Sequence, residues 1–189
     1  MIKKSELKLV PDTDPILFTT PSLFDFSGDE DSVMLSNIMF DRMKELGGIG
    51  LSANQVGLNI KMFVMGAGDA RMDVFNPEII SVSKTEIAHD EGCLSYPGVY
   101  MKIKRPESCT VRYQDNKGTT ITQELSGLTA RVFLHEYDHM EGKTFKDRVS
   151  KLKWDLAYHR MIKRTKKIIR KHTQKQIVDI ANQVKEKNV

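Results

Sequence analysis

Residues 134–142 contain two histidines four positions apart, with a glutamate directly after the first. On an α-helix, His135 and His139 lie about one turn apart on a single face, so both imidazoles can reach the same metal ion. Glu136 is displaced by roughly 100° around such a helix, which places it beside the ion, where it can take a proton from water. The motif therefore predicts a helix that carries a metal site and a base.

A third ligand is needed, because a match to this motif arises by chance in roughly one chain in a hundred of this length. Cys93 is the candidate. Gly92 before it permits close approach of the backbone, and Leu94 after it can offer an N–H group beside the ion. A lone cysteine is more often a small buried hydrophobe, and we assign that role to Cys109, which lies in the alternating segment 108–113.

The length of 189 residues, of which 40% are apolar, suits one globular domain with an appendage. Two cysteines cannot build the disulfide framework of a small secreted protein, so reduced thiols in a cytosol are expected. Residues 1–20 contain no apolar run of signal-peptide length, and no later segment reaches the length of a membrane span. We expect a cytoplasmic monomer that makes no membrane contact.

The net charge of +4 hides an asymmetry between the two ends of the chain. Residues 150–189 contain 12 Lys or Arg against 3 Asp or Glu, a net of +9, whereas residues 1–149 contain 17 against 22, a net of −5. We expect a catalytic domain over residues 1–149 and a basic helical extension over residues 150–189, with one helix over 151–171 and a second over 174–187.

The beginning of the chain predicts an arm followed by a helix. Residues 1–28 contain three of the six prolines and are expected to be extended. Ser27 and Glu30 can form a capping box before an amphipathic helix that ends at Gly47. Its apolar stripe, which we assign to core packing, is Leu35, Ile38, Met39, Met43 and Leu46.

Short apolar runs bounded by Gly, Pro or Asp predict antiparallel strands. Residues 115–118 predict a hairpin turn, Ser126 can cap the histidine-bearing helix, and Gly142 can end it. The expected fold is α+β, with antiparallel sheets around a central metal-binding helix and a C-terminal basic helix. The expected strands are residues 61–65, 72–75 and 79–82, followed by further strands within residues 99–125, among them 109–114 and 119–125.

Residues 47–57 form a glycine-rich segment that can approach a ligand closely. It lacks the Gly-Lys-Ser/Thr ending of a phosphate-binding loop, so it is a weak nucleotide candidate. Gln55 within it can donate a hydrogen bond to a developing oxyanion. Leu128 and Val132 fall on nearly the same helix face as His135, where they can wall a pocket beside the metal.

Three motifs, taken together, resemble the peptide deformylase family. They are Gly-Ile-Gly-Leu-Ser-Ala-Asn-Gln at residues 48–55, Glu-Gly-Cys-Leu-Ser at residues 91–95, and His-Glu-Tyr-Asp-His at residues 135–139. They occur in the family order, and the resemblance covers about residues 10 to 147. The chain departs from the family pattern at Ser52, where alanine is usual, at Leu134 in place of glutamine, and at Met140 in place of leucine.

The resemblance implies a metal-dependent hydrolase that removes the formyl group from the N-terminal formyl-methionine of new polypeptides and releases formate. Cys93, His135 and His139 would hold one divalent ion, Fe²⁺ in cells, with Zn²⁺, Ni²⁺ or Co²⁺ able to replace it. Glu136 would move the proton. Gln55 and the N–H of Leu94 would stabilise the oxyanion.

The resemblance also implies how the peptide binds. Its extended backbone would pair with the chain near Ile49, Gly50 and Gly92, and its methionine side chain would enter the pocket between Leu128 and Val132.

Arg105 supports a further hypothesis. Its guanidinium can clamp Glu91, Asp138 or both and so fix the ligands, and the alternative is a solvated surface arginine.

Two other classes of protein remain open at this point. A peptidase that cuts internal bonds shares the histidine motif, but the chain lacks a third distal histidine or glutamate at the required spacing. A nucleic-acid-binding module with structural zinc would use the bases at residues 163–167 and 170–171. If the chain is a deformylase, the same Lys and Arg residues would dock it on ribosomal RNA near nascent chains. The alternative is that they form a solvated helix face.

Overall fold

The computed structural model describes residues 7–66 and 70–187, with side chains described as far as residue 176. The chain divides into two compact units, Met1–Val149 and Ser150–Val189. The first unit holds both sheets and the histidine-bearing helix, and the second is a single helix.

The first unit begins with the 3₁₀ helix η2 (Pro15–Phe18) and the helix α1 (Ser32–Glu45). The predicted capping box at Ser27 and Glu30 is wrong. Asp31, which directly precedes the first helical residue, accepts a hydrogen bond from the backbone N–H of Met34 at 2.8 Å. The predicted apolar stripe is confirmed as packing: Leu35, Met39 and Met43 are buried, and Ile38 and Leu46 pack against the same cluster.

Seven strands form two antiparallel sheets in the described part of the first unit. The five-stranded sheet has the order β1-β2-β3-β6-β7, and β4 pairs with β5 in the second sheet. The strands are β1 (Gly50–Ser52), β2 (Met62–Met65), β3 (Met72–Val82), β4 (Glu86–Gly92), β5 (Tyr100–Pro106), β6 (Ser108–Gln114) and β7 (Thr120–Ser126).

Two features of the strands differ from the sequence expectation. The segments 72–75 and 79–82 belong to one strand, β3, which continues through a register shift between Phe75 and Glu78. Asn76 absorbs the irregularity with a φ of 48°, and its side chain bonds the backbone of Phe24. Strand β4 was not predicted, because residues 86–90 are all exposed and show no apolar alternation.

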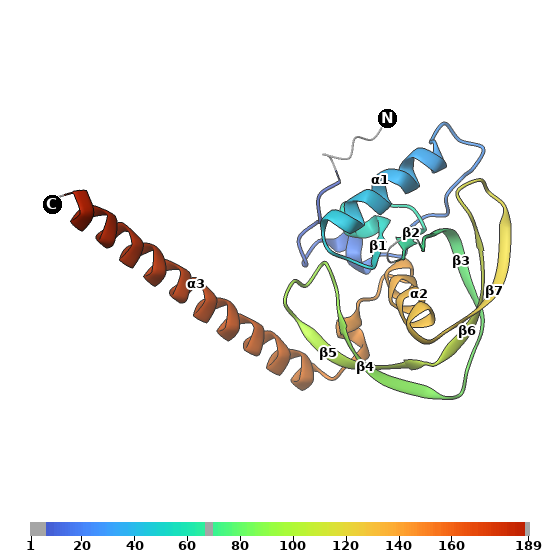
Figure 1. Ribbon diagram of the computed structural model, residues 1–189. Helices are drawn as coiled ribbons and strands as arrows, with labels where there is room; N and C mark the ends of the chain where they lie inside the picture. The colour runs from blue at the N-terminus through green and yellow to red at the C-terminus, as the bar shows by residue number, and fades with distance from the viewer. Residues whose placement is uncertain (1–6, 67–69, 188–189) are drawn as a thin grey trace. The chain divides into compact units, whose positions relative to one another are not determined.

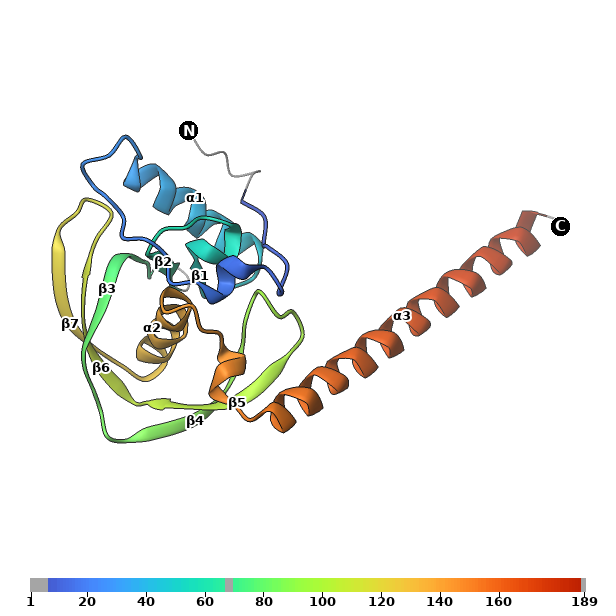
Figure 2. The same ribbon diagram turned by 180° about the vertical axis from the view of Figure 1, so that it is seen from behind.

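The helix α2 (Gly127–Met140) lies in the middle of the first unit. Strands β3, β6 and β7 lie on one side of it and β4 and β5 on another, as the opposite view also shows (Figures 1 and 2). The Phe133 ring packs edge-to-face on Phe63 of β2 with centroids 5.1 Å apart, which joins the helix to the large sheet. The expected arrangement of antiparallel sheets around this helix is confirmed.

At the N-terminal end of α2 the predicted cap is not formed, whereas at its C-terminal end the predicted glycine is in place. Ser126 occupies the N-cap position, but its side chain makes no capping hydrogen bond, so this expected contact is absent. Gly142 follows the C-terminal end with a φ of 64°. A Cβ atom there would lie 2.9 Å from the backbone of Phe18, so both conformation and space favour glycine.

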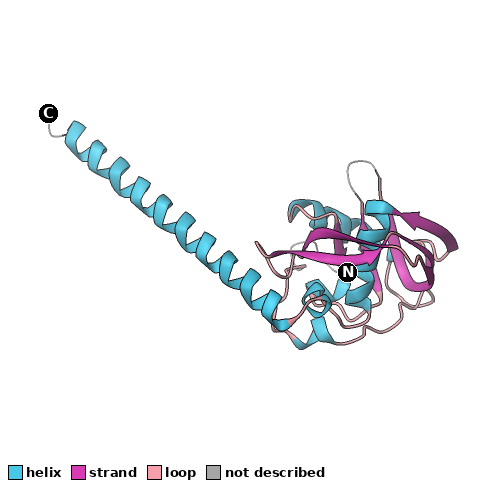
Figure 3. Cartoon of the chain, turned by 90° about the horizontal axis from the view of Figure 1, so that it is seen from below, coloured by secondary structure: helices cyan, strands magenta, loops and turns pink. Residues whose placement is uncertain are grey.

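The second unit is the helix α3 (Lys151–Lys187), which runs without a break (Figure 3). The expected division into two helices is therefore wrong. Residues 172–174 are His, Thr and Gln, which include neither of the strong helix breakers Gly and Pro. Among the described residues, none of the helices combines the length and apolar character needed to cross a membrane.

Candidate active site

The helix α2 supplies three side chains of the candidate site from its buried face. His135 and His139 lie one turn apart with ring centroids separated by 5.5 Å. Glu136 lies between them in sequence and is 4% exposed. Phe133 and Met140 of the same helix are buried in the core, and this packing fixes the positions of the two histidines and the glutamate.

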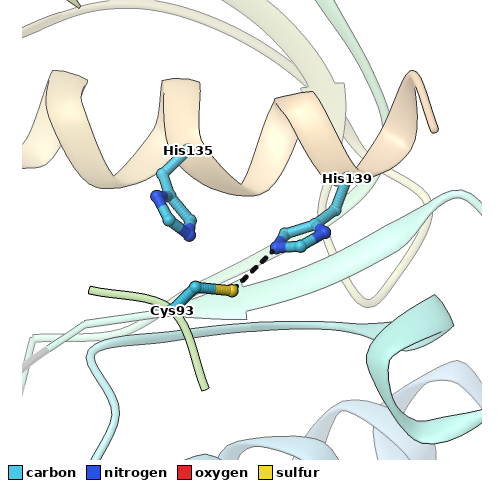
Figure 4. A group of neighbouring side chains, drawn as sticks. All are labelled: Cys93, His135 and His139. Atoms are coloured by element: carbon cyan, nitrogen blue, oxygen red, sulfur yellow. Dashed lines mark hydrogen bonds between the residues drawn. The ribbon is translucent and has the colours of Figure 1, made fainter. Parts of the chain in front are cut away.

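Cys93 reaches the histidines from the connection between β4 and β5. Its Sγ lies 3.4 Å from Nε2 of His139, and Figure 4 shows the thiol facing both imidazoles. The backbone N–H of Tyr96 donates to the carbonyl of Cys93 at 2.9 Å, which makes the turn that presents the thiol. One ligand atom from each of Cys93, His135 and His139 can be chosen so that all three lie within 4.8 Å of one another.

The three side chains fit a divalent metal ion. One sulfur and two imidazole nitrogens suit borderline ions such as Fe²⁺, Co²⁺, Ni²⁺ and Zn²⁺. Burial alone would lower the pKa of His135, but hydrogen bonds to Cys93 and Glu91 outweigh it and raise the pKa to about 10. This group of ligands therefore favours a positive charge, which a bound cation would supply in place of the proton.

Glu91, the last residue but one of β4, orients His135. Its Oε2 lies 3.0 Å from Nδ1 of His135, which leaves the Nε2 atom of that ring to face the other ligands. Burial would raise the pKa of Glu91, but hydrogen bonds from His135 and Arg105 outweigh it and hold the pKa at about 2. The low pKa keeps the carboxylate ionised against the imidazole at neutral pH.

Arg105 of β5 joins this anion to α2. Its Nε and Nη2 atoms donate to both oxygens of Glu91 at 2.7 and 3.0 Å, and its Nη1 donates to Oδ2 of Asp138 at 2.9 Å. The hypothesis that Arg105 clamps one or both carboxylates matches this geometry, and the alternative of a solvated arginine is wrong, because Arg105 is 2% exposed. Asp138 is also bonded by Arg148.

Glu136 is held against strand β1. Ser52 Oγ donates to its Oε2 at 2.6 Å. A Cβ atom on Gly50 would lie 2.2 Å from its Oε1, so the carboxylate occupies space that only glycine leaves open. Burial raises the pKa of Glu136 above its usual range, which suits a group that must both accept and release a proton.

Gln55 follows β1 in the 3₁₀ helix η3 (Ala53–Val56) and points its amide at the cysteine. Its Nε2 lies 3.4 Å from Cys93 Sγ and donates to Ser95 Oγ at 2.9 Å. Its Oε1 accepts from the backbone N–H of Ser52 at 2.9 Å, which fixes the amide orientation. The donor hydrogens therefore lie beside the ligand cluster.

A cavity of about 390 Å³ opens onto these groups. Leu94 lines it, with a Cδ1 atom 2.7 Å from where a Cβ of Gly48 would be. Val132 is 9% exposed and Leu128 is 66% exposed, so Val132 lies deep in the wall and Leu128 at the mouth. The other expected peptide-binding residues, Ile49, Gly50 and Gly92, also line this cavity.

Three residues of the site were not recognised from the sequence. Arg131 donates to Glu91 Oε1 at 2.6 Å, and its position one turn before His135 was the available signal. Ser52 was noted only as a departure from the family pattern. Asn54 Nδ2 donates to the backbone carbonyl of His139 at 2.9 Å, and no local pattern indicated this long-range contact.

The sequence matches the family model of polypeptide deformylase over residues 6–155. Peptide deformylase of Thermotoga maritima is 42% identical over 116 residues, which cover 61% of this chain and 70% of that protein. Peptide deformylase 1B of Arabidopsis thaliana, named chloroplastic/mitochondrial, is 41% identical over 152 residues, which cover 78% of this chain. The chain spans 55% of the length of that plant protein.

A solved structure gives the same result for the fold. The peptide deformylase of Synechococcus elongatus, solved in complex with actinonin, superposes with a TM-score of 0.76 at 33% identity. The match covers 82% of this chain and 85% of that one. Because the family match includes all three motifs and both sheets, the chain belongs to the polypeptide deformylase family.

Proposed function

We propose that this protein is a metal-dependent hydrolase that removes the formyl group from the N-terminal formyl-methionine of newly made polypeptides and releases formate. The observation that carries this proposal is the cluster of Cys93, His135 and His139 beside a cavity that Glu136 and Gln55 also line. Catalysis would reside in residues 1–149.

The ion would be held by Cys93 Sγ and the two imidazoles. A divalent metal bound there supplies Lewis-acid activation of the formyl carbonyl and of water at neutral pH. We propose Fe²⁺ as the ion used in cells, with Zn²⁺, Ni²⁺ and Co²⁺ as functional replacements, because a thiolate with two imidazoles suits all four.

Glu136 would carry the proton. Among the described residues, Ser52 is the side chain that hydrogen-bonds this carboxylate, and it occupies Oε2. Oε1, which lies against Gly50 at the cavity wall, is then the oxygen that accepts a proton from the attacking water. Glu136 next passes this proton to the amine nitrogen as the bond between that nitrogen and the formyl carbon breaks.

Gln55 would stabilise the negative charge that forms on the formyl oxygen. Its Nε2 hydrogens lie beside Cys93 Sγ, and the hydrogen bond from Ser52 N–H to its Oε1 prevents the amide from turning. The backbone N–H of Leu94 would be the second donor.

The cavity would orient the peptide. Val132 and Leu128 offer an apolar wall for the methionine side chain. The carbonyl of Ile49 accepts from Gly66 N–H at 3.0 Å, so by strand alternation the polar backbone groups of Gly50 face away from β2. We propose that the extended peptide backbone pairs with the chain near Ile49, Gly50 and Gly92.

The test is formate release from formyl-Met-Ala-Ser by protein purified without oxygen, with the metal content measured on the same sample. We expect stoichiometric formate and free Met-Ala-Ser, and no cleavage of casein. Hydrolysis of casein, or an intact formyl peptide with the metal site full, would contradict the proposed activity.

The partners would be formyl-methionyl peptides and nascent chains, met at the ribosome. The Lys and Arg side chains at residues 163, 164, 166 and 167 of α3 are all exposed, which supports contact with ribosomal RNA.

We further propose that the protein is a monomer. We also propose that it lies in the cytoplasm, because both cysteines are free, as in a reducing compartment. Sedimentation and cell fractionation test these two points.

A further inference from the structure

Ser52 contacts both the carboxylate of Glu136, the proposed base, and the side-chain amide of Gln55. Its Oγ donates to Oε2 of Glu136 at 2.6 Å, and its backbone N–H donates to Oε1 of Gln55 at 2.9 Å. The residue is 0% exposed and belongs to a strand paired with β2, opposite Phe63. One residue on a rigid element therefore contacts both groups.

The alternation of strand β1 explains how the carboxylate is held. Gly50 and Ser52 point to the same face because side chains repeat every second residue. Leu51 points the other way, into the core cluster beside α1. On the shared face, Gly50 leaves the space that Oε1 occupies, and Ser52 binds Oε2.

The hydroxyl of Ser52 has two acceptors within reach. The carboxylate Oε2 lies at 2.6 Å, whereas the backbone carbonyl of Glu136 lies at 3.4 Å. A hydroxyl has one proton to donate, and O–H···O hydrogen bonds are normally about 2.5–3.0 Å long, a range that includes the contact to Oε2 and excludes the one to the carbonyl. The proton therefore goes to the carboxylate.

We infer that Ser52 is a positioning residue for the reaction. It holds the Glu136 carboxylate in one rotamer, with Oε2 occupied and Oε1 directed to the cavity. This inference rests on the proposed function for its kinetic part. The Ser52 hydroxyl contacts Glu136 and caps the backbone N–H of Gln55, whereas the bond that fixes the Gln55 amide comes from the Ser52 backbone N–H. Replacing Ser52 by alanine therefore removes the contact to Glu136 and leaves the bond to the Gln55 amide.

The first test is a crystal structure of the metal-loaded parent beside Ser52→Ala. We expect one Glu136 rotamer in the parent and a displaced or divided carboxylate in the variant, with Gln55 unmoved. A carboxylate that keeps its place in Ser52→Ala would overturn the inference. This comparison does not depend on deformylation, so it decides the positioning role even if the parent releases no formate, a result that would refute the proposed function alone.

The second test is kinetic. Ser52→Ala should lower kcat about tenfold, equal to about 1.4 kcal/mol, with KM changed less than about twofold. Ser52→Thr, which keeps the hydroxyl, should recover most of the loss. In a Glu136→Gln background the same change should cost nothing further, because Ser52 acts through the carboxylate. An equal loss in both backgrounds would show general damage and contradict the positioning role.

Ser36 provides the matched control. It is also a serine at 0% exposure with a hydrogen-bonded hydroxyl, but it lies in α1 and contacts Val33, Arg71 and Asn116. Ser36→Ala should change stability and leave kcat and the Glu136 rotamer as in the parent. A kcat loss equal to that of Ser52→Ala would assign the effect to loss of any buried hydroxyl.

Discussion

The Nδ1 atom of His135 lies 3.0 Å from Oε2 of Glu91, a residue 44 positions earlier in the chain. This contact ties the second sheet to the helix that carries both histidines. It also sets which nitrogen of the imidazole remains for a metal. The strength of metal binding should therefore depend on a residue that is not itself a ligand.

Glu91→Gln should weaken metal binding by about 10- to 100-fold, because the amide holds the His135 ring less firmly and removes a negative charge. Competition with a chromophoric chelator measures the change. Glu86→Gln, an exposed position on the same strand, is the control and should bind metal like the parent. Equal affinities for the parent and Glu91→Gln would show that the contact does not support the site.

Arg105→Ala should lower the free energy of unfolding by about 3 kcal/mol, because it removes the cation shared by two buried carboxylates, each of which keeps one arginine, Arg131 or Arg148. Those carboxylates belong to Glu91 and Asp138. Arg112→Ala breaks an exposed pair with Glu78 and should cost only about 0–1 kcal/mol. Urea unfolding of both variants makes the comparison, and similar costs would argue against a structural role for the Arg105 clamp.

The two cysteines should differ in reactivity. Iodoacetamide should modify Cys93 only after a chelator removes the metal, because a bound thiolate is not free to attack. Cys109 should stay unmodified in the folded protein in both states, since burial raises the pKa of its thiol to about 11. Mass spectrometry of the peptides reads both sites. Equal labelling of Cys93 with and without metal would remove it from the ligand set.

Neutralising Lys163, Arg164, Lys166 and Lys167 together should abolish salt-sensitive co-sedimentation with ribosomes, because counterion release at phosphates drives such binding. Hydrolysis of a short formyl peptide should be unaffected. Changing Lys102 and Lys104 of β5, which are exposed but lie in the first unit, provides a charge control. Binding that survives the change in α3 would mean that the helix does not dock the enzyme.

The sequence predicted the parts of the site that follow local rules. The spacing of His135 and His139 required a helix, and Gly92 beside Cys93 indicated close approach of the backbone. The two carboxylates proposed as partners of Arg105 belong to the motifs of the site, and both contact it. Contacts made across the fold were harder to predict: Ser52 meets Glu136 only because β1 packs against α2, and no short-range pattern carries that information.

The same distinction holds for the fold. The alternation of apolar and polar residues predicted β6 and β7. Strand β4 was not predicted, because nearly all of its residues are exposed. The sequence predicts that a strand ends before Asn76-Pro77, but tertiary contacts of the Asn76 side chain let β3 continue. Propensity likewise could not decide between one helix and two after residue 150, where no glycine or proline marks a boundary.

We propose that Glu136 moves the proton and is not a ligand. The most direct measurement is formate release from formyl-Met-Ala-Ser by the parent and by Glu136→Gln, with the metal content determined on the same samples. We expect the variant to keep its metal and to lose about 10²-fold or more in kcat, because the amide cannot accept a proton. Loss of metal in Glu136→Gln, or a metal-loaded variant that turns over like the parent, would contradict this account.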